Sequence, residues 1–300
     1  MVPGIDPKVD YVFKRLFGRA ANQALAIHLL NAVLEPAPRQ RVVDLELLNP
    51  FNGRDYADDK LSILDIKARD QSGRQFNVEM QLLANRHFRP RVLYYWARLH
   101  QSHLTEGEDY GVLRPTLSIC FVNTPLFPEI PAYHVVFELR ERAYPQVAFT
   151  DHLVVHILEL SKFTKSAAEL ATPLDVWLYF LRHGERLDAA ALPPALDVVA
   201  EVQRAMGELL MVTQSDLERE RYEARLKFQR DMSTALREAR EEGLEQGLER
   251  GLKEGWVRQI HSYQRLLRRT PTPTEQLLAL PLEELERSAQ QLEAELARGQ

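Results

Sequence analysis

The chain has 300 residues, of which 45% are hydrophobic and 27% are charged, and its formal net charge is −5. This is the composition of a soluble protein with one large domain or two smaller ones, and it excludes a global basic field, so any nucleic-acid contact must rest on a local patch. We expect no internal disulfide, because the chain has one cysteine, and no membrane span, because no apolar stretch reaches about 18 residues. The chain also lacks a basic region followed by an apolar one at its start, so a cytoplasmic location is expected.

The first elements are expected to be helical. Apolar residues recur at spacings of three and four over residues 10–34, which predicts a helix, and Gly18 and Asn22 indicate a break within it. Two prolines end this segment near residue 38. Residues 41–49 are predicted to form the first strand, followed by a loop that runs to residue 59.

A β-hairpin is the most informative stretch of the chain. Its arms are residues 61–70 and 74–83, and both alternate apolar and polar side chains, as strands with one buried face do. Asp70 and Gly73 are residues that a short hairpin turn favours. Folding about Ser72 therefore places the two arms in a definite register.

That register puts two acids together. It brings Asp65 opposite Glu79, with Gln81 two residues further along the same polar face. Like charges across a hairpin are destabilising, and the commonest compensation is a hard divalent cation bound through oxygens. The competing interpretation is that these are solvated residues on the outer face of an edge hairpin.

A basic segment follows the hairpin. Residues 84–103 contain four arginines and three histidines without one acid, and Pro90 suits the first turn of a helix that runs to about residue 106. Helical spacing places arginines and tyrosines on one face, which suits a phosphate backbone. The predicted DNA-binding residues are Arg86, Arg89, Arg91, Tyr95 and Arg98. The competing interpretation is a solvated basic helix whose Tyr and Trp side chains pack inward.

The remaining strands complete a mixed α/β core. Residues 115–122 predict a strand buried on both faces, in which Cys120 is a small core residue rather than a nucleophile. Residues 133–140 are a further strand candidate, and residues 152–160 fit either a strand or the start of a helix. The order of elements predicts a mixed α/β sandwich over residues 1–165, with a helical extension at 166–213 that packs on it.

The C-terminal part is expected to be all-helical. A charged helix is predicted at 214–258, and residues 259–300 form a final helical segment. Within the charged helix, glycine recurs every four residues from Gly243 to Gly255, each followed by Leu or Trp. Such ridges let two helices pack closely, so we expect a homo-oligomer formed through this region. A partly disordered, solvated linker is the alternative.

Several motifs together resemble one known family. In chain order they are the segment 6–18, the hairpin 64–81, the Arg91-x-x-Tyr94-Tyr95 helix, the segment 107–115 and the segment 158–163. They are similar to the recombination-promoting nuclease and transposase family of the PD-(D/E)XK nuclease superfamily, whose members often carry glycine-rich tails of this kind. The resemblance implies a restriction-endonuclease-like mixed sheet flanked by helices.

The resemblance also implies a role for individual residues. Asp65 and Glu79 correspond to the metal-binding acids of the two motif strands, and Asp10 to an acidic position on the first helix. Gln81 stands where many relatives of the superfamily have lysine, and glutamine offers no cationic donor for water activation. The implied cofactor is Mg²⁺, for which Mn²⁺ can substitute, and the implied catalytic set is Asp65, Glu79, Gln81 and Asp10.

The function expected from these features is metal-dependent hydrolysis of DNA by an endonuclease linked to recombination, mobile elements or defence. Two alternatives stay open. One is a nuclease fold that binds DNA or a protein partner with little or no cleavage, which the glutamine and the acidic net charge favour. The other is a scaffold that acts mainly through the helical tail.

Overall fold

The structure is a computed structural model that describes residues 1–49, 66–82 and 86–298. The chain forms two compact units, Met1–Phe228 and Gln229–Gln300.

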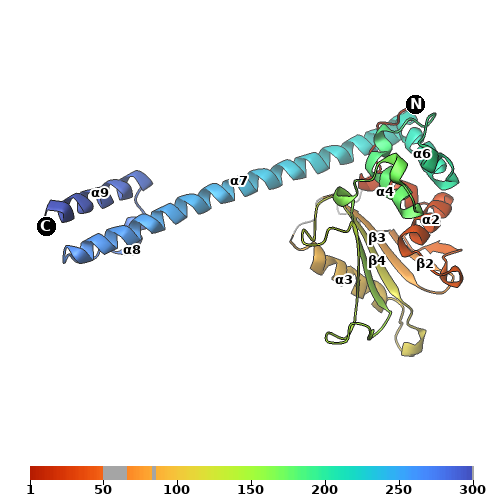
Figure 1. The fold of residues 1–300 in the computed structure, drawn as a ribbon, viewed down its shortest axis with the longest axis horizontal. Helices are drawn as coiled ribbons and strands as arrows, with labels where there is room; N and C mark the ends of the chain where they lie inside the picture. Colours follow the sequence, from red (N-terminus) through yellow and green to blue (C-terminus); the bar gives the residue numbers. More distant parts are fainter. Residues whose placement is uncertain (50–65, 83–85, 299–300) are drawn as a thin grey trace. The chain divides into compact units, whose positions relative to one another are not determined.

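The first unit is built on a mixed sheet (Figure 1). In the described residues its strands are β1 (Leu45–Leu47), β2 (Ile66–Asp70), β3 (Gln75–Gln81), β4 (Thr116–Val122), β5 (His134–Glu138) and β6 (Leu153–Glu159). They lie in the order β1-β2-β3-β4-β6-β5. The pairs β3–β4 and β4–β6 are parallel, and the other pairs are antiparallel. The mixed α/β core predicted from the sequence is therefore confirmed.

Helices cover both faces of this sheet. The helices that begin in the first unit are α1 (Asp10–Phe17), α2 (Gln23–Leu34), α3 (Phe88–Gln101), α4 (Pro173–His183), α5 (Pro194–Asp197), α6 (Ala200–Gln214) and α7 (Asp216–Leu266). On one face Phe76, Val78 and Met80 of β3 join the main hydrophobic core with side chains of α1, α2, α4 and α6. On the other face Phe88 and Val92 of α3 pack against β4 and β6.

Strand β4 is the centre of this core. All seven of its residues are buried, as predicted from its apolar run, and Cys120 is a fully buried core residue. The region 152–160 is a strand, β6, because it pairs with both β4 and β5. The predicted helix break is also confirmed, since α1 ends at Phe17 and α2 begins at Gln23.

The first strand is shorter than predicted. Strand β1 has three residues, and the backbone before it bonds to two side chains, Asn31 of α2 and Gln71 of the hairpin turn, rather than to a neighbouring strand. The side chain of Asn31 on α2 accepts a hydrogen bond from the Val42 N–H (2.9 Å) and donates one to the Val42 carbonyl (2.8 Å). These bonds satisfy the backbone of Val42 without a strand partner.

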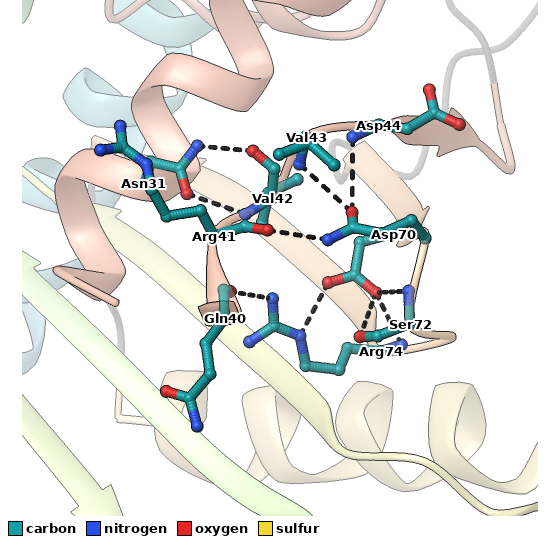
Figure 2. A network of polar contacts seen from close by, with 10 residues as sticks. Asn31, Gln40, Arg41, Val42, Val43, Asp44, Asp70, Ser72 and Arg74 are labelled. Carbon is teal, nitrogen blue, oxygen red and sulfur yellow. Dashed lines mark hydrogen bonds and ion pairs between the residues drawn. The ribbon is translucent and has the colours of Figure 1, made fainter. Parts of the chain in front are cut away.

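The hairpin turn is fixed by one carboxylate (Figure 2). Asp70 Oδ1 accepts hydrogen bonds from the Ser72 N–H (2.9 Å), the Ser72 hydroxyl (2.8 Å) and the Arg74 N–H (3.0 Å), and its Oδ2 accepts one from Arg74 Nε (2.7 Å). Gly73 has φ +84°, a conformation that favours glycine. The turn sets Ile66 opposite Val78, the register expected from folding about Ser72.

The second unit is helical. The final part of α7 packs with α8 (Thr274–Leu278) and α9 (Leu282–Arg298) through a small apolar cluster that includes Ile260, Leu277 and Leu285. A Cβ added to any glycine of the four-residue repeat would meet no atom of another described element within 4 Å, and Leu244, Leu248 and Leu252 are exposed. Among the described helices, none combines the length and apolar composition needed to cross a bilayer.

Candidate active site

A row of polar side chains runs along β3 on the face covered by α3. Gln75, Asn77 and Glu79 are all buried, and Gln81 is half-buried. Strand β3 is an inner strand with β2 and β4 on its two sides, and α3 packs over it. The interpretation of Glu79 as a solvated residue on an edge hairpin is therefore wrong, because a neighbouring strand and a helix remove it from water.

Arg91 on α3 binds both polar side chains at the end of this row. Its Nη2 donates to Glu79 Oε1 (2.5 Å) and to Gln81 Oε1 (2.7 Å). The side chain of Glu79 is 3% exposed and that of Arg91 is 36% exposed, so the carboxylate is interior and the guanidinium reaches it from the surface. A buried carboxylate requires such a partner, because desolvation of an unpaired charge is costly.

Local structure explains why these groups meet. Glu79 and Gln81 are two residues apart on a strand, so they project from the same face. Phe88 and Val92 anchor the first turns of α3 in the apolar cluster on β4 and β6, which brings Arg91 over the end of β3. The guanidinium carbon of Arg91 also lies 5.5 Å from the centre of the Phe88 ring.

Asp10 is buried at the start of α1. Its carboxylate accepts a hydrogen bond from the Tyr11 N–H (2.8 Å) and one from Arg225 Nε on α7 (2.5 Å), with which it forms an ion pair. Glu218, nearer the start of α7, accepts hydrogen bonds from Tyr11 and from Arg15 (2.5 Å each). The start of α7 is thus bound to α1 through buried charges.

Burial and the Glu218 carboxylate act together on Tyr11. Loss of hydration, and then the hydrogen bond to Glu218, raise the pKa of Tyr11 to about 12. The phenol therefore stays neutral at every physiological pH and donates a hydrogen bond to Glu218.

Asp65 lies outside the described residues, so its pairing with Glu79 and its role as a metal ligand stay predictions. Within the described ranges, no three histidine, cysteine or acidic side chains lie close enough together to hold a metal ion. The oxygens of Glu79 and Gln81 are nevertheless ligands that Mg²⁺ prefers, and they already hold a cationic group. The donor set therefore fits a hard divalent cation.

The basic residues predicted to bind DNA divide into two groups. Arg86, Arg89 and Arg98 are exposed, whereas Arg91 is directed at Glu79. Arg89 lies 4.3 Å from the centre of the Phe127 ring and bonds to the Leu126 carbonyl.

The aromatic residues of α3 divide in the same way. Tyr95 is half-buried with its ring against the exposed Tyr94 (5.6 Å between centres), while Trp96 donates a hydrogen bond to the Thr116 carbonyl (2.8 Å). Arg89, Arg98 and Tyr94 of α3 are thus exposed to solvent, whereas Trp96 is bonded to the sheet through the Thr116 carbonyl.

Sequence reasoning did not find two of these contacts. Arg91 was expected to face DNA, and the alternation of β3 did not show that a helix would bring this arginine to Glu79. Arg225 is 215 residues from Asp10 and lies in a run rich in Arg and Glu, where nothing in the local pattern distinguishes it from its neighbours.

The fold and this polar row define the nuclease-like α/β class, in which a mixed sheet with helices on both faces carries acidic and amide side chains on an inner strand. The family model described as PD-(D/E)XK nuclease family transposase matches residues 7–239. The chain therefore belongs to this family, as the resemblance of its motifs indicated. A search of curated proteins and a search of solved structures each found no match.

Proposed function

We propose that the protein is a metal-dependent DNA endonuclease that acts in recombination, mobile-element movement or defence. The main support is the buried carboxylate of Glu79 beside the amide of Gln81, in a chain that belongs to a nuclease family. A buried acid on an inner strand has a cost in stability, which a functional role would explain.

In this proposal Asp65 and Glu79 hold Mg²⁺, for which Mn²⁺ can substitute, and Gln81 orients the attacking water or the scissile phosphate. The bound cation would lower the pKa of a water and neutralise charge that develops on phosphate oxygens. Asp10, which forms an ion pair with Arg225, would add a carboxylate from α1.

The exposed part of α3 would bind the DNA backbone. Arg89 and Arg98 on α3, and Arg86 just before it, are cations available to phosphates, and Tyr95 lies half-buried on the same helix. Binding of this kind is electrostatic, so it should weaken steeply as salt concentration rises. The net charge of −5 restricts the contact to this local patch.

The tail would make the protein a homo-oligomer. The glycines and leucines of the four-residue repeat are uncovered within the described chain, and such a surface suits close packing against a second helix. A cytoplasmic location is part of the same proposal and suits the one buried cysteine.

The second candidate is a nuclease fold that binds DNA or a protein partner without cutting it. The observation that favours it is that the guanidinium of Arg91 donates a hydrogen bond to one oxygen of Glu79 and to one oxygen of Gln81. As long as that contact persists, a metal cation must compete with Arg91 for those oxygens.

The deciding experiment is nicking of supercoiled plasmid DNA with titrated Mg²⁺ or Mn²⁺. The wild-type protein should nick, and Glu79→Gln should lower the rate by at least about 100-fold, because it removes a charged ligand while keeping the shape. Glu46→Gln is the matched control, since Glu46 is an exposed acid on β1 that pairs with Arg69 at the surface.

Equal nicking by Glu79→Gln and the wild-type protein would remove Glu79 from the site. Salt-sensitive DNA binding with no nicking in either metal would favour the second candidate.

A further inference from the structure

The contact between Arg91 and Glu79 has an unusual hydrogen-bond pattern. Both hydrogen bonds to Glu79 and Gln81 come from one nitrogen, Nη2, although a guanidinium has five N–H donors. Arg91 Nε is buried and has no hydrogen-bond partner among the described residues. An arginine that served only to neutralise Glu79 would be expected to use its two-nitrogen fork on the carboxylate.

The two partners also differ in access to solvent. The Glu79 side chain is 3% exposed, whereas the Arg91 side chain is 36% exposed. The guanidinium can therefore be reached from outside while its Nη2 stays on the buried acid. Arg89, two residues earlier on the same helix, is also exposed, but residues two apart on a helix do not share a face, and Arg89 contacts Phe127 rather than Glu79.

Binding of a divalent cation to Glu79 would change the balance of charge around Arg91. A divalent cation on Glu79 would stand a few ångströms from the positive charge of Arg91, and the two cations would repel each other. A phosphate group relieves this repulsion, because it carries one negative charge and accepts the paired N–H groups of a guanidinium.

We propose that Arg91 is a displaceable counter-ion of Glu79 that moves from the carboxylate to a DNA phosphate when metal binds. The inference rests on the proposed nuclease function and deepens it, because it couples the two ligands of that site. Arg91 weakens metal binding in the free protein and strengthens DNA binding in the metal-loaded protein. The site is thus loaded with metal mainly when DNA is present.

The test separates the charge of Arg91 from its hydrogen bonds. Mn²⁺ binding to the free, full-length protein is measured by the loss of the electron paramagnetic resonance signal of free Mn²⁺. Arg91→Gln and Arg91→Met remove the charge and should each bind Mn²⁺ about tenfold more tightly than the wild-type protein. Arg91→Lys keeps the charge and should bind Mn²⁺ as the wild-type protein does.

Kinetics provide the second measurement. In Arg91→Gln the Mn²⁺ concentration for half-maximal nicking should fall, while KM for DNA should rise. Arg89→Met is the matched control, because it removes an exposed cation from the same helix without touching Glu79. It should raise KM for DNA and leave Mn²⁺ affinity unchanged.

Two outcomes would overturn the inference, and they differ in what else they remove. Equal or weaker Mn²⁺ binding by both Arg91→Gln and Arg91→Met, with a wild-type protein that nicks DNA, refutes the counter-ion role and leaves the nuclease function intact. No Mn²⁺ uptake and no nicking by any form refutes both. Circular dichroism of each variant confirms that the compared proteins are folded.

Discussion

A buried histidine pair at the edge of the sheet should make the stability of the first unit depend on pH. His156 on β6 is buried, and its Nδ1 lies 3.0 Å from Nε2 of His134 on β5, with the rings stacked 5.3 Å apart. Burial, and then the charge of His134, lower the pKa of His156 from 6.5 to about 4. Burial also lowers the pKa of His134.

The direction of the effect follows from proton binding in the two states. Well above pH 6.5, His156 is neutral whether the protein is folded or unfolded, and this histidine takes nothing from the free energy of unfolding. As pH falls below 6.5 the unfolded chain gains a proton that folded His156 does not accept until about pH 4. The unfolding free energy should thus fall by about 2 kcal/mol by pH 5 and about 3 kcal/mol by pH 4.

Urea unfolding of the wild-type protein and of His156→Gln at pH 7.5 and pH 5.0 tests this. Glutamine keeps a polar group near His134 but does not titrate. The unfolding free energy should fall about 2 kcal/mol more in the wild-type protein than in the variant. His261→Gln in the second unit is the matched control, and it should keep the pH dependence of the first unit. Equal losses in wild-type protein and His156→Gln would refute the reasoning.

The other predictions concern the hairpin turn, the α1–α7 contact and the tail. Asp70→Ala should lower the free energy of unfolding by about 3 kcal/mol. Asp70→Asn should lower it by less, because asparagine still accepts the hydrogen bonds from the turn N–H groups. Equal losses for the two variants in urea unfolding would contradict this. Arg225→Met should destabilise by about 3 kcal/mol, because it removes the guanidinium that pairs with the buried Asp10 carboxylate. Adding Asp10→Asn should recover much of that loss, whereas additive effects would argue against the pair. Residues 1–228 alone should fold but be monomeric by light scattering, and an unchanged number of protomers would exclude the tail as the means of assembly.

Local patterns in the sequence were sufficient for the elements that depend on neighbours along the chain. The turn at Asp70 and Gly73 set the hairpin register, because an aspartate and a positive-φ glycine act over only a few residues. The apolar run of β4 and the break after Phe17 were predicted for the same reason. The limits of β1 were not, since the backbone before it bonds to Asn31 from another element.

The sequence by itself determined the α/β class, the hairpin and the motifs that assign the chain to its family. Only the tertiary structure decided that α3 covers the polar row of β3, that Arg91 pairs with Glu79 and that Arg225 pairs with Asp10. Alternation along a strand gives the direction of a side chain relative to its own sheet. It does not show which helix packs on that face of the sheet, because the positions of the helices depend on contacts between residues far apart in the chain.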